Sequence, residues 1–202
     1  MKTLLIIDVQ NDFMPNGSLP VPYGNEIVPN INAIQDKFDL IVATQDWHPR
    51  DHVSFANNHE GKSNFDEIKI HGVPQTLWPD HCVQGTEGAA FHPDLNTNKI
   101  ETIFRKGTDK TIDSYSAFYD NRHLKSTGLA GYLKEKGTSA LYLCGLAADI
   151  CVYFSVRDAV KEGFSCFFIE DASKALDTKA FEKLKKSMVA MGIKMVTSAD
   201  IL

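Results

Sequence analysis

The sequence SALYLCGLAADICVYFSVRDAVKEGFSCFFIED, residues 139–171, contains two apolar runs on either side of an amphipathic segment. The runs, 139–145 and 165–171, are continuous rather than alternating, which is typical of strands covered on both faces. The segment between them, 149–163, ends at Gly163, and glycine commonly stops helices. The stretch therefore predicts a strand, a helix and a second parallel strand.

The same alternation of predicted strands and helices continues through the chain, which has no repeat, no low-complexity tract and no evident linker. Four more apolar runs predict strands, at 3–8, 40–45, 101–106 and 193–198. Three more segments predict helices, at 25–38, 128–137 and 177–192. The predicted fold class is α/β: a three-layer αβα arrangement around a doubly wound, mainly parallel six-stranded sheet. We expect residues 1–202 to form a single domain.

Composition excludes several classes of function. A hydrophobic fraction of 43% and a charged fraction of 23% are ordinary for a soluble globular protein, and a net charge of −5 argues against a nucleic-acid binder. The first apolar run is stopped by Asp8, too early for a membrane span or a signal peptide. The four cysteines form no close pair, as expected in a reducing compartment. We expect a cytoplasmic protein with no nucleic-acid or membrane partner, and a homo-oligomer is compatible with the sequence.

Cys151 lies where the helix of residues 149–163 should begin. The N–H groups and dipole of a helix start favour a thiolate, and a base and a cation would complete a nucleophilic site. Asp8 and Lys106 supply these groups at the ends of predicted strands, where sites form in open parallel sheets. Taken singly, Asp8 could be a turn residue and Lys106 a solvated surface charge. Their shared position at strand ends favours a catalytic site.

A second group lies in residues 46–99, a long segment of low periodicity that holds most of the histidines and both tryptophans. Such a segment is usually functional, here for metal and substrate. Asp46 and His48 point the same way in an extended chain, and His81 could be a third ligand. One carboxylate and two imidazoles suit zinc, manganese or iron. His52 and Ser54 are weaker candidates for this metal site.

Three aromatic residues lie near these positions in the sequence: Phe13, Trp78 and Tyr115. Loop packing is the commoner fate of such residues. Together they could also form a flat apolar slot, with the metal at one end and the thiol at the other, that accepts a small heteroaromatic substrate.

Six motifs resemble the signature segments of the nicotinamidase (pyrazinamidase) family within the isochorismatase-like cysteine hydrolases: DVQNDF, QDWHP, WPDHCVQGTEGAAFHP, FRKGTD, DSYSAF and GLAADICV. They occur in the family's order between residues 8 and 152. The resemblance implies a catalytic triad of Asp8, Lys106 and Cys151. It also implies one divalent metal, zinc before iron or manganese, on Asp46, His48 and His81.

The resemblance further implies a cis peptide bond between Leu146 and Ala147. The N–H groups of Ala147 and Cys151 would then form the oxyanion hole. Ala148 departs from the family, whose members commonly have threonine there, so a local hydrogen bond is in doubt.

The implied activity is hydrolysis of nicotinamide to nicotinic acid and ammonia through a thioester, in NAD salvage, with pyrazinamide as a further substrate. Three alternatives stay open: a metal-free amidohydrolase with the same triad, a hydrolase in which a metal-bound hydroxide attacks and Cys151 only packs, and a non-catalytic binding module. The two-histidine segment disfavours the first, and the full set of site residues disfavours the last. An isochorismatase-type hydrolase that needs no thiol is also disfavoured.

Overall fold

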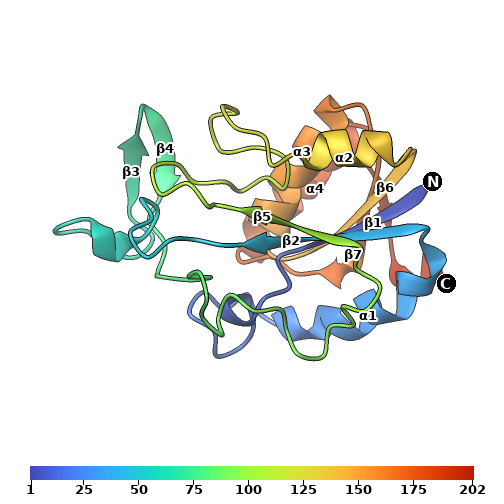
Figure 1. Ribbon diagram of the computed structural model, residues 1–202, viewed down its shortest axis with the longest axis horizontal. Helices are drawn as coiled ribbons and strands as arrows, with labels where there is room; N and C mark the ends of the chain where they lie inside the picture. Colours follow the sequence, from blue (N-terminus) through green and yellow to red (C-terminus); the bar gives the residue numbers. More distant parts are fainter.

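A computed structural model describes all residues, 1–202, and its centre is one parallel sheet of six strands (Figure 1). The strand order is β5-β2-β1-β6-β7-β8, and every neighbouring pair is parallel. The strands are β1 (Lys2–Ile7), β2 (Leu40–Asp46), β5 (Thr102–Lys106), β6 (Ala140–Gly145), β7 (Ser165–Ser173) and β8 (Lys194–Val196). All six predicted strands are present, and the predicted α/β fold class is confirmed.

Helices cover both faces of the sheet. The helix α1 (Ile27–Ile34) lies on one face, and α2 (Leu129–Glu135), α3 (Tyr153–Lys161) and α4 (Thr178–Ala190) lie on the other (Figure 1). Alternate side chains of β1 supply both cores: Leu4 and Ile6 join the α1 core, and Leu5 and Ile7 join the core under the other three helices. The continuous apolar run of this strand is therefore explained by burial on both faces.

The structure refines several predicted elements. The segment 149–163 begins with a π-helical turn, Ala148–Val152, before the regular helix α3. The segment 25–38 contains α1 between two short 3₁₀ turns, and Pro29 occupies the first turn of α1, where its missing N–H is harmless. Short 3₁₀ turns occur at Asn11–Phe13, Gly24–Glu26, Gln35–Lys37, Ala56–Asn58 and Ser198–Asp200.

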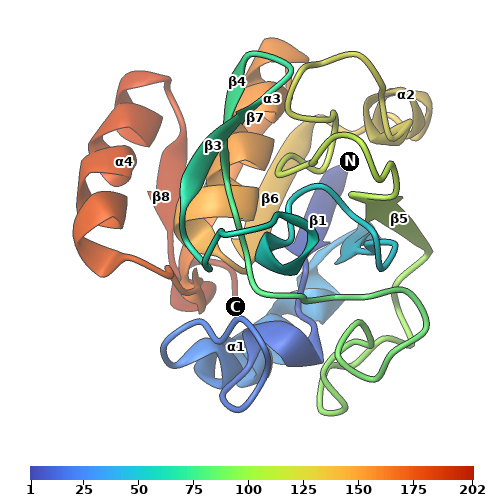
Figure 2. The same cartoon turned by 90° about the vertical axis from the view of Figure 1, so that its left-hand side faces the viewer.

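The segment 46–99 contains a hairpin that the sequence analysis missed. Its strands, β3 (Glu67–Ile70) and β4 (Val73–Thr76), form a separate antiparallel sheet. This hairpin lies beyond the carboxyl ends of the six parallel strands (Figures 1 and 2). Most of its side chains are half-buried or exposed, but Gln75 is buried. The hairpin therefore belongs to the edge of the sheet where a site is expected.

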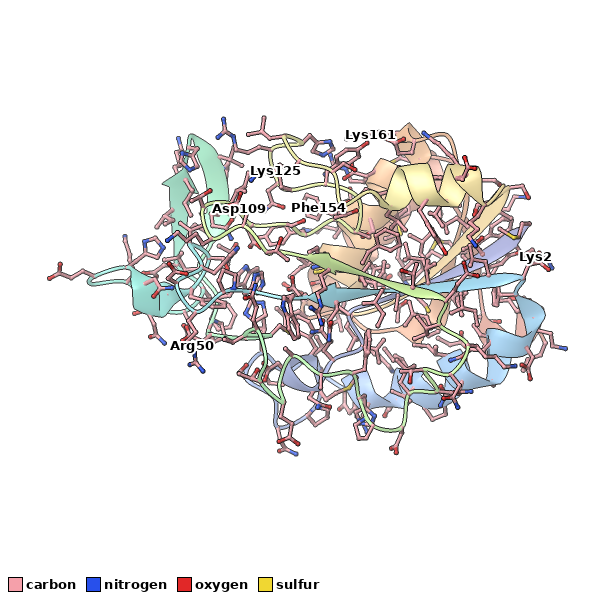
Figure 3. All side chains as sticks on the ribbon, in the orientation of Figure 1. Lys2, Arg50, Asp109, Lys125, Phe154 and Lys161 are labelled. Atoms are coloured by element: carbon pink, nitrogen blue, oxygen red, sulfur yellow. The ribbon has the colours of Figure 1, made fainter.

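Charged side chains such as Lys2, Arg50 and Lys161 lie at the surface (Figure 3). Cys144 and Cys166 are buried in strands, as predicted for cysteines in apolar runs. No helix of the structure has the length and apolar character needed to span a membrane.

Candidate active site

Three neighbouring strands end in the polar residues of the site. Asp46 and Lys106 are the last residues of β2 and β5, and Asp8 directly follows β1. In the sheet, β1 and β5 flank β2, so the parallel register brings these three carboxyl ends to one place. Cys151 comes from the π-helical turn after β6, the neighbour of β1 on its other side. Strand order thus gathers residues that are far apart in the sequence.

The first group of site residues is Asp8, Lys106 and Cys151, and Lys106 contacts the other two. Its Nζ lies 2.9 Å from Asp8 Oδ2 and 3.4 Å from Cys151 Sγ, and it donates a hydrogen bond to the carbonyl of Ser114. Thr44 Oγ1 donates to the other Asp8 oxygen at 2.6 Å, which fixes the carboxylate in this orientation. Lys106 is only 2% exposed, so the alternative of a solvated surface charge is wrong.

Burial and the neighbouring charges together set the protonation states of Cys151, Asp8 and Lys106. Burial raises the pKa of the Cys151 thiol well above its usual value, although Lys106 acts in the opposite direction. Burial also raises the pKa of Asp8. Burial alone would lower the pKa of Lys106, but Asp46 and Asp8 raise it well above its usual value, so the ammonium is retained. Burial thus favours the neutral thiol of Cys151, which therefore needs a base.

The second group is Asp46, His48 and His81, whose ligand atoms lie within 4.8 Å of one another. His48 Nε2 is 3.1 Å and His81 Nε2 is 3.6 Å from Asp46 Oδ2. The Nδ1 atoms lie 2.9 Å from the Gly107 carbonyl and 2.8 Å from the Pro79 carbonyl, respectively. A carbonyl only accepts hydrogen bonds, so each Nδ1 carries a proton and Nε2 is the nitrogen directed at the carboxylate. Burial opposes protonation of His48, but Asp46 raises the pKa of His48 above its usual value.

This donor set fits a divalent metal. Two imidazole nitrogens and a carboxylate oxygen lie within 4.8 Å of one another, and these are ligand types that zinc, iron and manganese accept. Burial opposes ionisation of Asp46, but His48 and Lys106 hold the pKa of Asp46 well below its usual value. Gly107 is needed beside the group, because a Cβ there would lie 2.4 Å from the His48 ring.

His52 and Ser54 lie beside this group but bond to each other. His52 Nδ1 is 2.7 Å from Ser54 Oγ, and the His52 ring centroid is 4.2 Å from that of His48. Burial and the neighbouring His48 lower the pKa of His52 to about 4, so the ring is neutral. The ligand atoms of His52, His48 and Asp113 lie within 4.8 Å of one another, and Asp46 is not part of this set.

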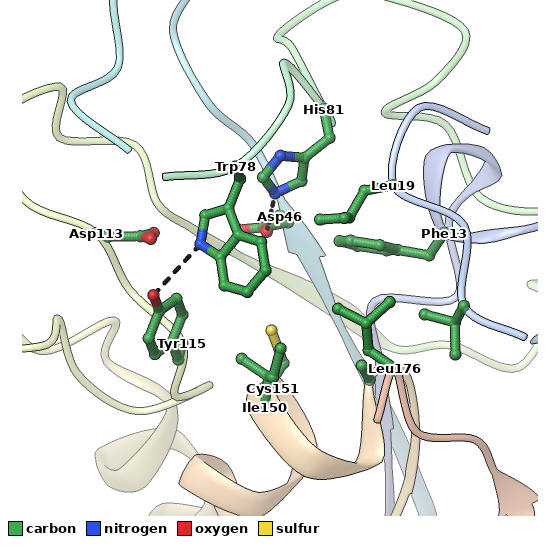
Figure 4. Close-up of a pocket in the computed structure, with 12 residues that line it drawn as sticks. Phe13, Leu19, Asp46, Trp78, His81, Asp113, Tyr115, Ile150, Cys151 and Leu176 are labelled. Carbon is green, nitrogen blue, oxygen red and sulfur yellow. Dashed lines mark hydrogen bonds and ion pairs between the residues drawn. The ribbon is translucent and has the colours of Figure 1, made fainter. Parts of the chain in front are cut away.

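A pocket joins the two groups (Figure 4). His81 lies at one end and Cys151 at the other, and the walls are mainly apolar. Asp46 is close to both, with a carboxylate oxygen 3.6 Å from His81 Nε2 and one within 4.8 Å of Cys151 Sγ. Twelve residues line it: Phe13, Leu19, Val21, Asp46, Trp78, His81, Asp113, Tyr115, Ala147, Ile150, Cys151 and Leu176. The three aromatic residues singled out in the sequence are among them.

Hydrogen bonds hold one aromatic wall in place. Trp78 Nε1 donates to Tyr115 Oη at 3.3 Å, and Gln75 Nε2 donates to the same oxygen at 3.1 Å and to Asp113 Oδ2 at 2.9 Å. Sequence reasoning missed Gln75 and Asp113. Asp113 lies in the motif DSYSAF and could have been found there, whereas nothing in the sequence marks Gln75.

The peptide bond between Leu146 and Ala147 is cis, as the resemblance implied. Ala147 lines the pocket beside Cys151, and its N–H donates no hydrogen bond to another protein atom. The N–H is therefore free to bind an oxygen atom of a substrate. The N–H of Ala148 donates a hydrogen bond to the Lys174 carbonyl at 2.7 Å.

Comparisons with known proteins agree with this architecture. A family model described as the isochorismatase domain matches residues 2–200. The nicotinamidase of Acinetobacter baylyi is 47% identical over 200 residues, which are 98% of this chain and 94% of that protein. A solved structure of an Acinetobacter baumanii nicotinamidase and pyrazinamidase superposes with a TM-score of 0.97, at 46% identity over 100% of this chain and 98% of that one.

Two further solved structures carry ligands. The yeast nicotinamidase bound to the inhibitor nicotinaldehyde has a TM-score of 0.93 and 31% identity, over 98% of this chain and all of that chain. The pyrazinamidase of Pyrococcus horikoshii in complex with zinc has a TM-score of 0.80 and 36% identity, over 97% and 98% of the two chains. With the family match and the full-length similarity, they lead to one conclusion: this chain belongs to the isochorismatase family, within its nicotinamidase group.

Proposed function

We propose that this chain hydrolyses nicotinamide to nicotinic acid and ammonia through a thioester on Cys151, as a step of NAD salvage. Pyrazinamide, which has the same carboxamide on a similar ring, is proposed as a second substrate. The observation that carries the proposal is the pocket, which the buried thiol of Cys151 and two of the three metal-ligand candidates, Asp46 and His81, line together. A flat heteroaromatic amide can reach from the thiol to these ligands.

The proposed chemistry begins with Asp8, whose raised pKa suits a general base that must later act as an acid. Asp8 takes the thiol proton, and the Cys151 sulfur attacks the carboxamide carbon. The Lys106 ammonium, 3.4 Å from the sulfur, balances the negative charge as it forms. The N–H groups of Ala147 and Cys151 receive the developing oxyanion.

Collapse of the tetrahedral intermediate breaks the C–N bond. Asp8 returns its proton to the departing ammonia, and the acyl group stays on Cys151 as a thioester. A water molecule, deprotonated by Asp8, then attacks the thioester carbon. The C–S bond breaks, nicotinic acid leaves, and the thiol regains its proton. Each proton that Asp8 takes is thus given back within the cycle.

Asp46, His48 and His81 are the proposed ligands of one divalent metal. Zinc is the first choice, with iron and manganese as alternatives, and the zinc complex of the Pyrococcus horikoshii relative supports this order. When bound, the metal would supply a Lewis-acidic position for the ring nitrogen of the substrate. The yeast relative is inhibited by nicotinaldehyde, which has an aldehyde where nicotinamide has its carboxamide, and this supports a pocket for a pyridine ring with a carbonyl substituent.

The proposal extends to the organisation and location of the chain. We assign catalysis to a single domain, residues 1–202, in which residues 46–99 carry the metal ligands and part of the substrate pocket. The four cysteines are free and buried, which supports a reducing, cytoplasmic location.

Ammonia release from nicotinamide tests the proposal, with the holoenzyme, the chelator-treated enzyme and the Cys151→Ala variant. We expect release by the holoenzyme, a large loss after chelation, and none by the variant. Mass spectrometry of enzyme quenched during turnover should find a nicotinoyl group on the peptide that contains Cys151. Substantial turnover by Cys151→Ala would reject the thioester and favour attack by a metal-bound hydroxide.

A further inference from the structure

The side chain of Gln10 takes the place of a strand beside Asp46. The strand β1 pairs with β2 only as far as Ile7, because Asp8 turns the chain away with a φ of 49°. Beyond this point Gln10 Oε1 accepts from the Asp46 N–H at 2.8 Å, and Gln10 Nε2 donates to the Asp46 carbonyl at 2.8 Å. On the other side, Asp46 pairs with Lys106 of β5. The backbone of Asp46 is thus held from both sides.

The side chain of Asp12 holds the turn that follows His81. Asp12 Oδ2 accepts a hydrogen bond of 2.7 Å from the N–H of Cys82. Cys82 is fully buried and has a φ of 47°, a conformation that residues other than glycine rarely adopt. Gly88 allows the approach, because a Cβ there would lie 2.2 Å from Asp12 Oδ2. The bond therefore stabilises an unfavourable backbone conformation next to a metal ligand.

We propose that Gln10 and Asp12 are positioning residues that hold the metal ligands Asp46 and His81 in place before the metal binds. Gln10 acts through the backbone of Asp46 itself, Asp12 acts through the backbone of the residue after His81, and neither belongs to the donor set. A ligand held in its binding geometry loses less conformational entropy when the metal binds, so affinity rises. This inference rests on the proposed function, since it concerns the same metal site.

Gln10→Leu tests the first position, with Gln45→Leu as its matched control. Both glutamines donate to the Ala89 carbonyl at 2.8 Å, but only Gln10 bonds the backbone of Asp46. Zinc affinity is measured by chelator competition on the holoenzymes, together with the unfolding midpoint of each metal-free protein. We expect zinc affinity to fall at least about tenfold in Gln10→Leu, the effect typical of lost outer-shell contacts, and to change less than twofold in the control.

Asp12→Ala tests the second position, with Asn11→Ala as its control. The Asn11 side chain donates to the Glu87 carbonyl and touches neither metal ligand. We expect Asp12→Ala to bind zinc at least about tenfold more weakly than the native enzyme in the same chelator competition. Asp12→Asn keeps an oxygen that can accept from the Cys82 N–H and should retain most of the affinity. This second position keeps the proposal testable even where Gln10→Leu does not fold.

Three outcomes overturn the positioning role. One is zinc binding by Gln10→Leu and Asp12→Ala equal to that of their controls. Another is a lowered unfolding midpoint in these variants with unchanged zinc affinity, which would mark a structural role. The last is a native protein that binds no divalent metal, and only this result would also reject the metal part of the proposed function. The first two leave the nicotinamidase proposal intact.

Discussion

The Nζ of Lys106 lies 3.0 Å from Oδ1 of Asp46, so one ion pair joins the proposed triad to the proposed metal group. The other Asp46 oxygen faces the two histidines, and the same Nζ is 2.9 Å from Asp8. A single buried cation therefore stands between two buried carboxylates. Any change at Lys106 should affect catalysis, metal binding and stability together.

Lys106→Met should abolish turnover and destabilise the fold. Removal of one partner from a buried ion pair typically costs about 3–5 kcal/mol, because the remaining charge is unpaired. Here Asp8 and Asp46 would also face each other without a cation. Urea unfolding of the metal-free proteins measures the effect. The double variant Asp8→Asn, Lys106→Met should recover part of the lost stability, and an equally unstable double variant would contradict this explanation.

Cys151→Ala should reduce nicotinamide turnover by at least about 10³-fold, since the members of a triad act as a unit. Asp8→Asn should cost about as much. Cys144→Ala is the matched control, because this cysteine is also buried but packs within β6 away from the pocket. Steady-state rates of purified, metal-loaded proteins provide the measurement. A Cys144→Ala variant as inactive as Cys151→Ala would point to general misfolding instead.

Benzamide, which has the carboxamide but no ring nitrogen, should be a poor substrate. If the metal end of the pocket anchors the ring nitrogen, its loss misplaces the carbon that Cys151 attacks, and kcat/KM should fall by about 10²–10³-fold. His48→Ala should lower nicotinamide turnover sharply and leave the small benzamide rate nearly unchanged. Equal rates on the two amides by the intact holoenzyme would rule out the anchoring role.

Removal of the metal should lower thermal stability as well as activity. A metal present at about 100 times its Kd stabilises a protein by about 2.7 kcal/mol, which corresponds to roughly 5–10 °C in Tm for a chain of this size. Calorimetry with and without a chelator checks this shift. The shift should vanish in His48→Ala and persist in His92→Ala, a histidine outside the ligand group. A chelator effect of equal size in both variants would be evidence against this metal site.

Tyr115→Phe should raise KM more than it lowers kcat. The change removes the oxygen that accepts from Trp78 and Gln75, so two donors at the pocket wall lose a partner, at a cost of about 1–3 kcal/mol. We expect KM for nicotinamide to rise about tenfold, because the side chains of the pocket wall would be held less firmly and would bind the substrate less well. Tyr119→Phe, which loses a bond to Glu162 outside the pocket, is the control. A kcat decrease of about 100-fold at unchanged KM would instead indicate that the hydroxyl acts in the transition state.

The sheet, and the polar residues at the carboxyl ends of three of its strands, could be predicted from the sequence for a simple reason. Apolar runs without alternation require burial on both faces, and the carboxyl ends of parallel strands meet at one edge. Asp8, Asp46 and Lys106 each stand at such an end, so their convergence followed from local patterns. The hairpin β3–β4 was missed because its two four-residue strands are largely half-buried or exposed and carry no strong apolar pattern.

Residue types and local order in the sequence alone determined the fold class, the nucleophile candidate and the metal-ligand candidates. Only the tertiary structure decided how these groups affect one another. The raised pKa of Cys151 depends on burial, and the ion pair of Lys106 with Asp46 depends on the adjacency of β2 and β5. The bonds from Gln10 and Gln75 depend on loops that return to the sheet edge. Such contacts join residues 36 to 60 positions apart, and contacts over such separations are set by packing rather than by sequence periodicity.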